Sequence, residues 1–337
     1  MACVLGSTLF TADLAILAAA YSLPSILGTV FLTAKYWRVR QGVSLRADQD
    51  PARVSSRVIL GYSGPLIVWS ACVLAVNGLG TSLVGALDFA GVATFAVATS
   101  MALAVSGFSN AAIAPLLPEL SSTLDRQGFR KLLAQSTRVN ALLLLACCVG
   151  SWAIGLFVLA GSDGLASTQT SIATVLLVPL AMTIRLTMTP LSMAFIARGT
   201  HHRVIFPPLA DAMITVVLSV VLGRHFGALG VAGAQVFGAF VAVILTCTWS
   251  ARRAGLQEDL ALPEILQVLG RLSVCLAVTA GCLVFLTDYG SHALTRIAVS
   301  ALCMLLCVGC GAFLLLRKQV VVAVTKNVMS RRHCGSP

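Results

Sequence analysis

Residues 141–159 read ALLLLACCVGSWAIGLFVL, nineteen positions without a charged side chain. A helix of that length rises about 28 Å, close to the ~30 Å of hydrocarbon in a bilayer. The segment just before it carries Arg130, Lys131 and Arg138, so an apolar span follows directly on a basic stretch. The same combination recurs along the chain and indicates a polytopic membrane protein.

Nine apolar stretches occur in the 337 residues, and the eighth is the shortest. We predict spans at Leu14–Ala34, Leu60–Leu83, Phe89–Leu116, Ala141–Leu159, Ile172–Ile196, Val204–Leu222, Leu229–Trp249, Leu272–Leu286 and Ala293–Leu316. Mean hydropathy is +0.94 and only 10% of residues are charged, against ~25% in a soluble domain. Lipid offers no hydrogen bonds to the backbone, and these stretches exceed the ~10 residues of a barrel strand. The predicted fold class is therefore all-α, a transmembrane helical bundle of about nine spans.

The formal net charge of +11 follows the predicted topology. All basic residues except Arg185, Arg224 and Arg296 lie in the odd-numbered gaps between spans, at the start of the eighth span or in the C-terminal tail. Positively charged loops face the cytoplasm, so we predict a cytoplasmic C-terminus and an outer residue 1. A charge that would suggest nucleic-acid binding in a soluble protein carries no such meaning here, and we expect no nucleic-acid partner.

Polar connectors divide the chain. Residues 35–57 form a long stretch with six basic residues, which we interpret as a cytoplasmic linker. Residues 1–34 precede it with one span, and residues 58–250 follow it with six spans joined by short turns. Residues 251–337 hold a second polar stretch, two accessory spans and the tail.

Several helices of the six-span unit carry polar residues at helical spacing. The sets are Ser63, Ser70 and Asn77; Ser106 and Asn110; Arg185, Thr189 and Ser192; and Asp211, Thr215 and Ser219. Each set shares one helix face, which in lipid turns inward to join helices or to line a wet cavity. For the hydroxyl groups alone, helix packing is the favoured interpretation. The candidate substrate-binding residues are Arg185, Asp211, Asn77, Asn110, Thr189 and Thr215.

Arg185 and Asp211 are ionisable residues well inside their spans, where a charge costs ~2.5–3.5 kcal/mol. Counted from the cytoplasmic ends of their helices, they differ in depth by only ~6 Å, which an extended arginine bridges. One interpretation is a buried ion pair that fixes the packing of consecutive helices. The other is a cationic point in a central cavity that holds an anionic substrate, with Asp211 tuning it or exchanging a cation. The sequence leaves both open.

Catalytic and metal sites are not indicated. The five histidines lie near span ends, and neither a nucleophile elbow nor a GxxxxGK phosphate loop occurs. The eleven cysteines lie mostly within spans, where a thiol packs as a small apolar group. We expect no enzymatic activity, no metal and no cofactor. The longest outer gap, residues 160–171, is too short for the large outer loop of a membrane-embedded glycan polymerase or ligase.

Two segments resemble the polysaccharide transporters of the multidrug/oligosaccharidyl-lipid/polysaccharide exporter superfamily. In the first, the basic turn IARGTHHR (residues 196–203) is followed by a span and the tight turn GRHFGALGVAGA (residues 223–234). In the second, IAPLLPELSS (residues 113–122) resembles the family's proline-ended helix before a basic inner loop. The resemblance implies two six-helix lobes. Residues 1–34 would match the last helix of the N-terminal lobe and residues 58–250 the C-terminal lobe, with no counterpart to the family's first five helices.

The resemblance also implies a function. O-antigen flippases of this family move undecaprenyl-pyrophosphate-linked oligosaccharide across the bacterial inner membrane by alternating access, for surface polysaccharide and lipopolysaccharide biosynthesis. The implied partners are this lipid-linked oligosaccharide, bilayer lipids and other polysaccharide-assembly membrane proteins, and Arg185 is the intramembrane base that would meet the pyrophosphate. The alternatives are a multidrug antiporter of the same fold, a glycan polymerase or ligase, and an inactive transporter fragment.

Overall fold

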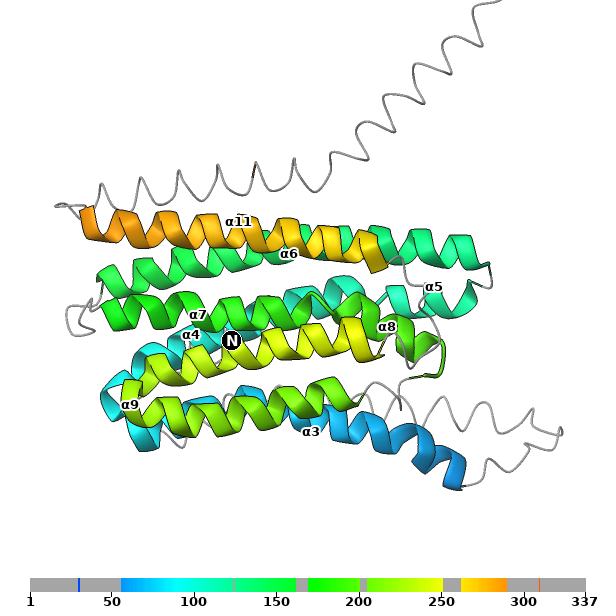
Figure 1. The fold of residues 1–337 in the computed structure, drawn as a ribbon, viewed down its shortest axis with the longest axis horizontal. Helices are drawn as coiled ribbons and strands as arrows, with labels where there is room; N and C mark the ends of the chain where they lie inside the picture. Colours follow the sequence, from blue (N-terminus) through cyan, green and yellow to red (C-terminus); the bar gives the residue numbers. More distant parts are fainter. Residues whose placement is uncertain are drawn as a thin grey trace, which may run out of the picture. The chain divides into compact units, whose positions relative to one another are not determined.

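The computed structural model describes residues 56–123, 125–161, 169–200, 205–250 and 262–289, together with the single residues 30 and 309. Helices and short turns account for these residues, and no strand occurs among them, which confirms the all-α class. Figure 1 shows long helices packed side by side. The elements are α3 (Ser56–Leu87), η2 (Phe89–Gly91), α4 (Val92–Ile113), α5 (Leu116–Ser122), α6 (Arg126–Gly161), α7 (Gln169–Leu186), α8 (Thr189–Ala197), α9 (Phe206–Leu245), η4 (Thr246–Ser250) and α11 (Leu262–Tyr289).

Six helical segments in the described part of the chain are long and apolar enough to cross a membrane. They are Ser63–Leu87, Phe89–Ser122, Arg126–Leu159, Gln169–Ala197, Phe206–Trp249 and Pro263–Gly281. By length and composition the chain fits a multi-pass membrane protein. Apart from the single residues 30 and 309, the predicted spans Leu14–Ala34 and Ala293–Leu316 lie outside the described residues, so the count of nine stays a prediction. The eighth span was predicted too short, because α11 begins at Leu262 rather than near Leu272.

Helix α9 is a hairpin of two arms. Gly227 has φ +56° and ψ −137°, a backbone conformation essentially confined to glycine, and it divides the helix into residues 206–226 and 228–245. The arms lie side by side (Figure 1), and a Cβ atom on Gly230 would collide with the carbonyl group of Leu222. The two arms correspond to the predicted spans Val204–Leu222 and Leu229–Trp249.

The carboxylate of Asp88 links the turn between α3 and α4 to the turn at Gly227 in α9. We call this end of the bundle the turn end. Asp88 Oδ1 accepts a hydrogen bond from the backbone N–H of Gly91 at 3.1 Å, and Oδ2 accepts one from Ala228 at 3.0 Å. Gly91 ends η2 and directly precedes α4, and Ala228 begins the second arm of α9, so a single negative charge lies near two helix N-termini. A Cβ atom on Gly227 would collide with Asp88, which makes glycine doubly necessary there.

The core of the bundle runs along α7. Nearly every α7 residue from Thr174 onward is buried, with Val175 enclosed beside Phe95 of α4 and Val231 of α9. On the other side Trp152 of α6 donates its indole N–H to the carbonyl of Leu176, 2.9 Å away. Helix α11 lies along α6 (Figure 1), and these two helices share an apolar cluster with α7.

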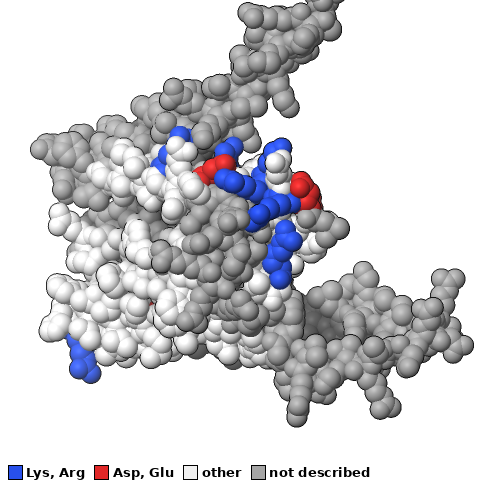
Figure 2. All heavy atoms as spheres, turned by 45° about the vertical axis from the view of Figure 1, so that its right-hand side comes forward, with Lys and Arg blue, Asp and Glu red and all other residues white. Residues whose placement is uncertain are grey.

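The charge asymmetry expected from the sequence is present in the described part of the chain. Figure 2 shows Lys and Arg gathered mainly at one end. This basic end holds the start of α6, the end of α8 and the start of α11; its residues include Arg126, Arg130, Lys131, Arg138 and Arg198. Glu264 lies 3.5 Å from Arg138 there, whereas Arg224 lies at the turn end. Which membrane side the basic end faces stays a prediction.

Candidate functional site

A break between α7 and α8 is the structural origin of the site. Pro190 has no N–H group, so the carbonyl of Leu186 loses its helical donor. Asn140 of α6 replaces that donor: its Nδ2 lies 2.9 Å from the Leu186 oxygen. Its Oδ1 accepts a hydrogen bond from Ser109 of α4 at 2.9 Å, and its side chain is fully enclosed. Hydrogen bonds among α4, α6 and α7 thus fix the geometry of the break between α7 and α8.

Replacing Asn140 with leucine is expected to destabilise the fold by about 1–3 kcal/mol, because the Leu186 carbonyl and the Ser109 hydroxyl would stay buried without partners. Equilibrium unfolding in mixed micelles measures the change. Ser100→Ala is the matched control, since its exposed hydroxyl bonds only to Ala96 of its own helix. Equal effects of the two substitutions would contradict the role given to Asn140.

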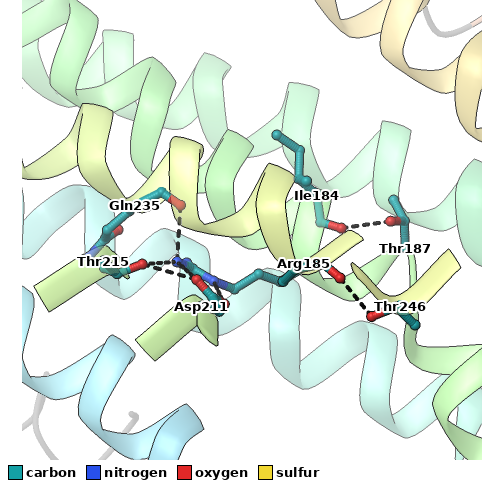
Figure 3. Close-up of polar contacts among 8 residues, drawn as sticks. Ile184, Arg185, Thr187, Asp211, Thr215, Gln235 and Thr246 are labelled. Atoms are coloured by element: carbon teal, nitrogen blue, oxygen red, sulfur yellow. Dashed lines mark hydrogen bonds and ion pairs between the residues drawn. The ribbon is translucent and has the colours of Figure 1, made fainter. Parts of the chain in front are cut away.

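Arg185 lies two residues from the start of the break and forms an ion pair with Asp211 on the first arm of α9. Its Nε lies 2.8 Å from Asp211 Oδ2 and its Nη2 3.1 Å from Oδ1. Nη2 also donates to the Thr215 hydroxyl at 3.3 Å and to the backbone carbonyl of Gln235 at 3.0 Å (Figure 3). The guanidinium therefore connects α7 to both arms of α9.

Gly238 on the second arm makes room for this cluster. A Cβ atom there would lie 2.6 Å from Asp211 Oδ1 and would collide with the Thr215 hydroxyl. The side chains of Arg185 and Asp211 are only 15% and 9% exposed. Such burial weakens solvent screening and strengthens the attraction between the two charges.

A cavity of about 540 Å³ opens beside the ion pair, within the 300–1,000 Å³ usual for ligand sites. Its polar lining comes largely from four faces that the sequence pattern had grouped: Ser70 and Asn77; Ser106 and Asn110; Arg185, Thr189 and Ser192; and Asp211; Thr246, which the pattern had not grouped, adds a further hydroxyl. Its apolar lining includes Trp69, Val73, Leu74, Met182, Met188 and Met193.

All six candidate residues lie at this cavity or directly beside it. Five of them line the cavity: Asn77, Asn110, Arg185, Thr189 and Asp211. The sixth, Thr215, is buried and holds the ion pair instead, donating to Asp211 Oδ1 at 3.0 Å.

Among the other hydroxyl groups of these faces, the favoured packing interpretation fits Ser219, which is enclosed. It does not fit Ser70, Ser106 or Ser192, which face the cavity. Sequence reasoning missed Asn140 and the Gln235 carbonyl. An asparagine opposite a proline-broken span was the available signal for Asn140, whereas nothing in the sequence marks a backbone oxygen.

The thiol of Cys72 tests whether water reaches the cavity. Cys72 lies on the cavity wall, while Cys148 is fully enclosed. In variants that keep only one cysteine, a charged methanethiosulfonate reagent is expected to modify Cys72 at least about tenfold faster than Cys148, because thiol reactivity follows access. Mass spectrometry measures the rates. Equal rates in the folded protein would mean that the cavity is dry.

The two interpretations of Arg185 and Asp211 are compatible, since both the ion pair and the cavity are present. Fold and site together define a bundle of span-length helices around a partly polar cavity, with a buried charge pair in its wall. No protein-family model, curated protein or solved structure matches this chain.

Proposed function

We propose that this chain acts in transport across a membrane, flipping an anionic lipid-linked oligosaccharide of the undecaprenyl-pyrophosphate type at the bacterial inner membrane. The observation that carries the proposal is the position of Arg185: a guanidinium within a helical segment of span length, lining a cavity large enough for a head group. Ionisable residues at such depth are functional candidates by default.

The lining of the cavity favours an amphiphile. Arg185, Asp211 and Thr189 supply polar groups within a largely apolar wall, whereas Val73 and Leu74 on α3 line the cavity and are also 45% and 74% exposed. A polar head group fits beside Arg185 while an apolar chain passes these exposed side chains into lipid. The identity of the carrier lipid rests on the resemblance of residues 113–122 and 196–234 to polysaccharide transporters.

Transport in proteoliposomes tests the proposal. The full chain is reconstituted with a fluorescent lipid-linked oligosaccharide, and its appearance in the opposite leaflet is followed with a membrane-impermeant quencher. The double variant Arg185→Gln/Asp211→Asn removes both charges without leaving either unpaired, so the fold is kept. We expect flipping to be at least about tenfold slower, because one charge-assisted contact worth ~1.5–3 kcal/mol is lost.

Arg224→Gln is the control, because this arginine lies at the turn end and outside the cavity lining. Unchanged flipping in the double variant would overturn the proposal. Export of a lipophilic cation in place of the glycolipid would support the multidrug-antiporter alternative, which the methionines Met182, Met188 and Met193 in the lining favour.

A further inference from the structure

The hydrogen bonds of Arg185 show what a second anion would have to displace. In the described contacts, its Nε and Nη2 are used by Asp211, Thr215 and the Gln235 carbonyl, and none of these contacts uses Nη1. A head group in the cavity therefore meets one free edge of a guanidinium whose charge Asp211 already neutralises. Two anions would then share one cation in a weakly screened site.

In the described part of the chain, no other charged side chain lines the cavity. Among the described lining residues, Arg185 is the one cation and Asp211 the one anion. In the cavity that Asp211 lines, α3 contributes the Cys72 thiol and α4 the neutral Ser106 and Asn110; on the second α9 arm, Gly238 lies beside Asp211 and the Gln235 carbonyl accepts from Arg185. A carboxylate that loses its buried partner is strongly disfavoured, so the missing positive charge has to come from solution.

We propose that Asp211 is a proton-binding site coupled to the anion site at Arg185. When an anionic head group takes over contacts of Arg185, Asp211 accepts one proton from water in the cavity, and it releases that proton when the head group leaves. The small space between Thr215 and Gly238 favours a proton over a hydrated metal cation. This inference rests on the proposed function, because it names the ion that accompanies its substrate.

Coupled uptake has a definite sign. One proton bound with each ligand makes the dissociation constant rise about tenfold per pH unit. Binding therefore weakens as pH rises. A site without coupling shows a flat profile with a ligand that does not itself titrate.

Calorimetry on the full chain in phosphatidylcholine nanodiscs tests the coupling. The probe is a synthetic short-chain prenyl-pyrophosphoryl sugar, a pyrophosphate diester with no group that titrates near neutral pH. Titrations in two buffers of different ionisation enthalpy give the number of protons taken up. We expect about one proton per bound ligand for the wild type and none per bound ligand for Asp211→Asn. Glu119→Gln, an exposed acid on α5, should leave the proton number unchanged.

The outcomes separate the two proposals. Binding by the wild type without proton uptake overturns the coupling and leaves the transport proposal standing. Affinity that follows sodium concentration but not pH overturns the assignment of the proton. Absence of binding by the wild type overturns both proposals. The wild-type proton number needs no variant, so misfolding of Asp211→Asn does not affect it.

Discussion

Replacing Arg185 with alanine is expected to destabilise the bundle by about 3–5 kcal/mol, the usual effect of removing one partner of a buried ion pair. Asp211 would keep only the Thr215 hydroxyl of its recorded side-chain partners, and the Gln235 carbonyl would lose its contact with the guanidinium. Reversible unfolding in mixed detergent micelles gives the free energy of unfolding.

A double variant separates the effect of the unpaired charge from the effect of lost packing. Arg185→Ala/Asp211→Ala should recover a large part of the loss, because no charge is then left unpaired. Arg224→Ala, an exposed arginine at the turn end, should stay within about 0.5 kcal/mol of the wild type. If the double variant were less stable than Arg185→Ala, the ion pair would not be the source of the effect.

Gly227→Ala is expected to destabilise the fold by about 2–4 kcal/mol. The backbone conformation at residue 227 costs a side-chain-bearing residue about 1–3 kcal/mol, and loss of a helix cap adds about 1. The cap is lost because the new methyl group would push Asp88 away from the Ala228 amide.

Gly233→Ala is the matched control for this prediction. Residue 233 lies on the second arm of the same helix, and a Cβ atom there would meet nothing within 4 Å. Alanine is the better helix former, so this variant should be as stable as the wild type or more stable by up to about 1 kcal/mol. Similar losses in both variants would mean that the arm itself, and not the turn, is sensitive.

The fold class and the helices were predictable because lipid imposes them on a sequence. An apolar stretch such as residues 141–159 has no other way to satisfy its backbone in a bilayer. Helix ends were not predictable to the same degree. Helix α6 begins at Arg126, well before the apolar stretch, since Phe129 and Leu133 are buried against α5 and α8. Such packing depends on neighbours that a local pattern does not contain.

The polar part of the site was predictable for a similar reason. Helical spacing puts Arg185 and Thr189 on one face, and the cost of burying Asp211 alone requires a partner. The support around the pair was not predictable. Asn140 is one polar residue in an apolar helix until the Leu186 carbonyl is known to need a donor. Gly238 matters only because a second arm folds back onto Asp211.

Helix α3 lines the cavity far from Asp88, so a tilt of this helix about Asp88 would move the cavity wall. Helix α3 is held near the turn end, where Gly80 packs closely on Gln235, and it lines the cavity from Asn77 back to Trp69. Trp69 is about 28 Å along the helix from Asp88, so a rotation of about 10° about that carboxylate moves it by about 5 Å. Because displacement grows with distance from the pivot, a tilt of α3 about the turn end would change the cavity wall at Trp69 far more than the packing at Gly80.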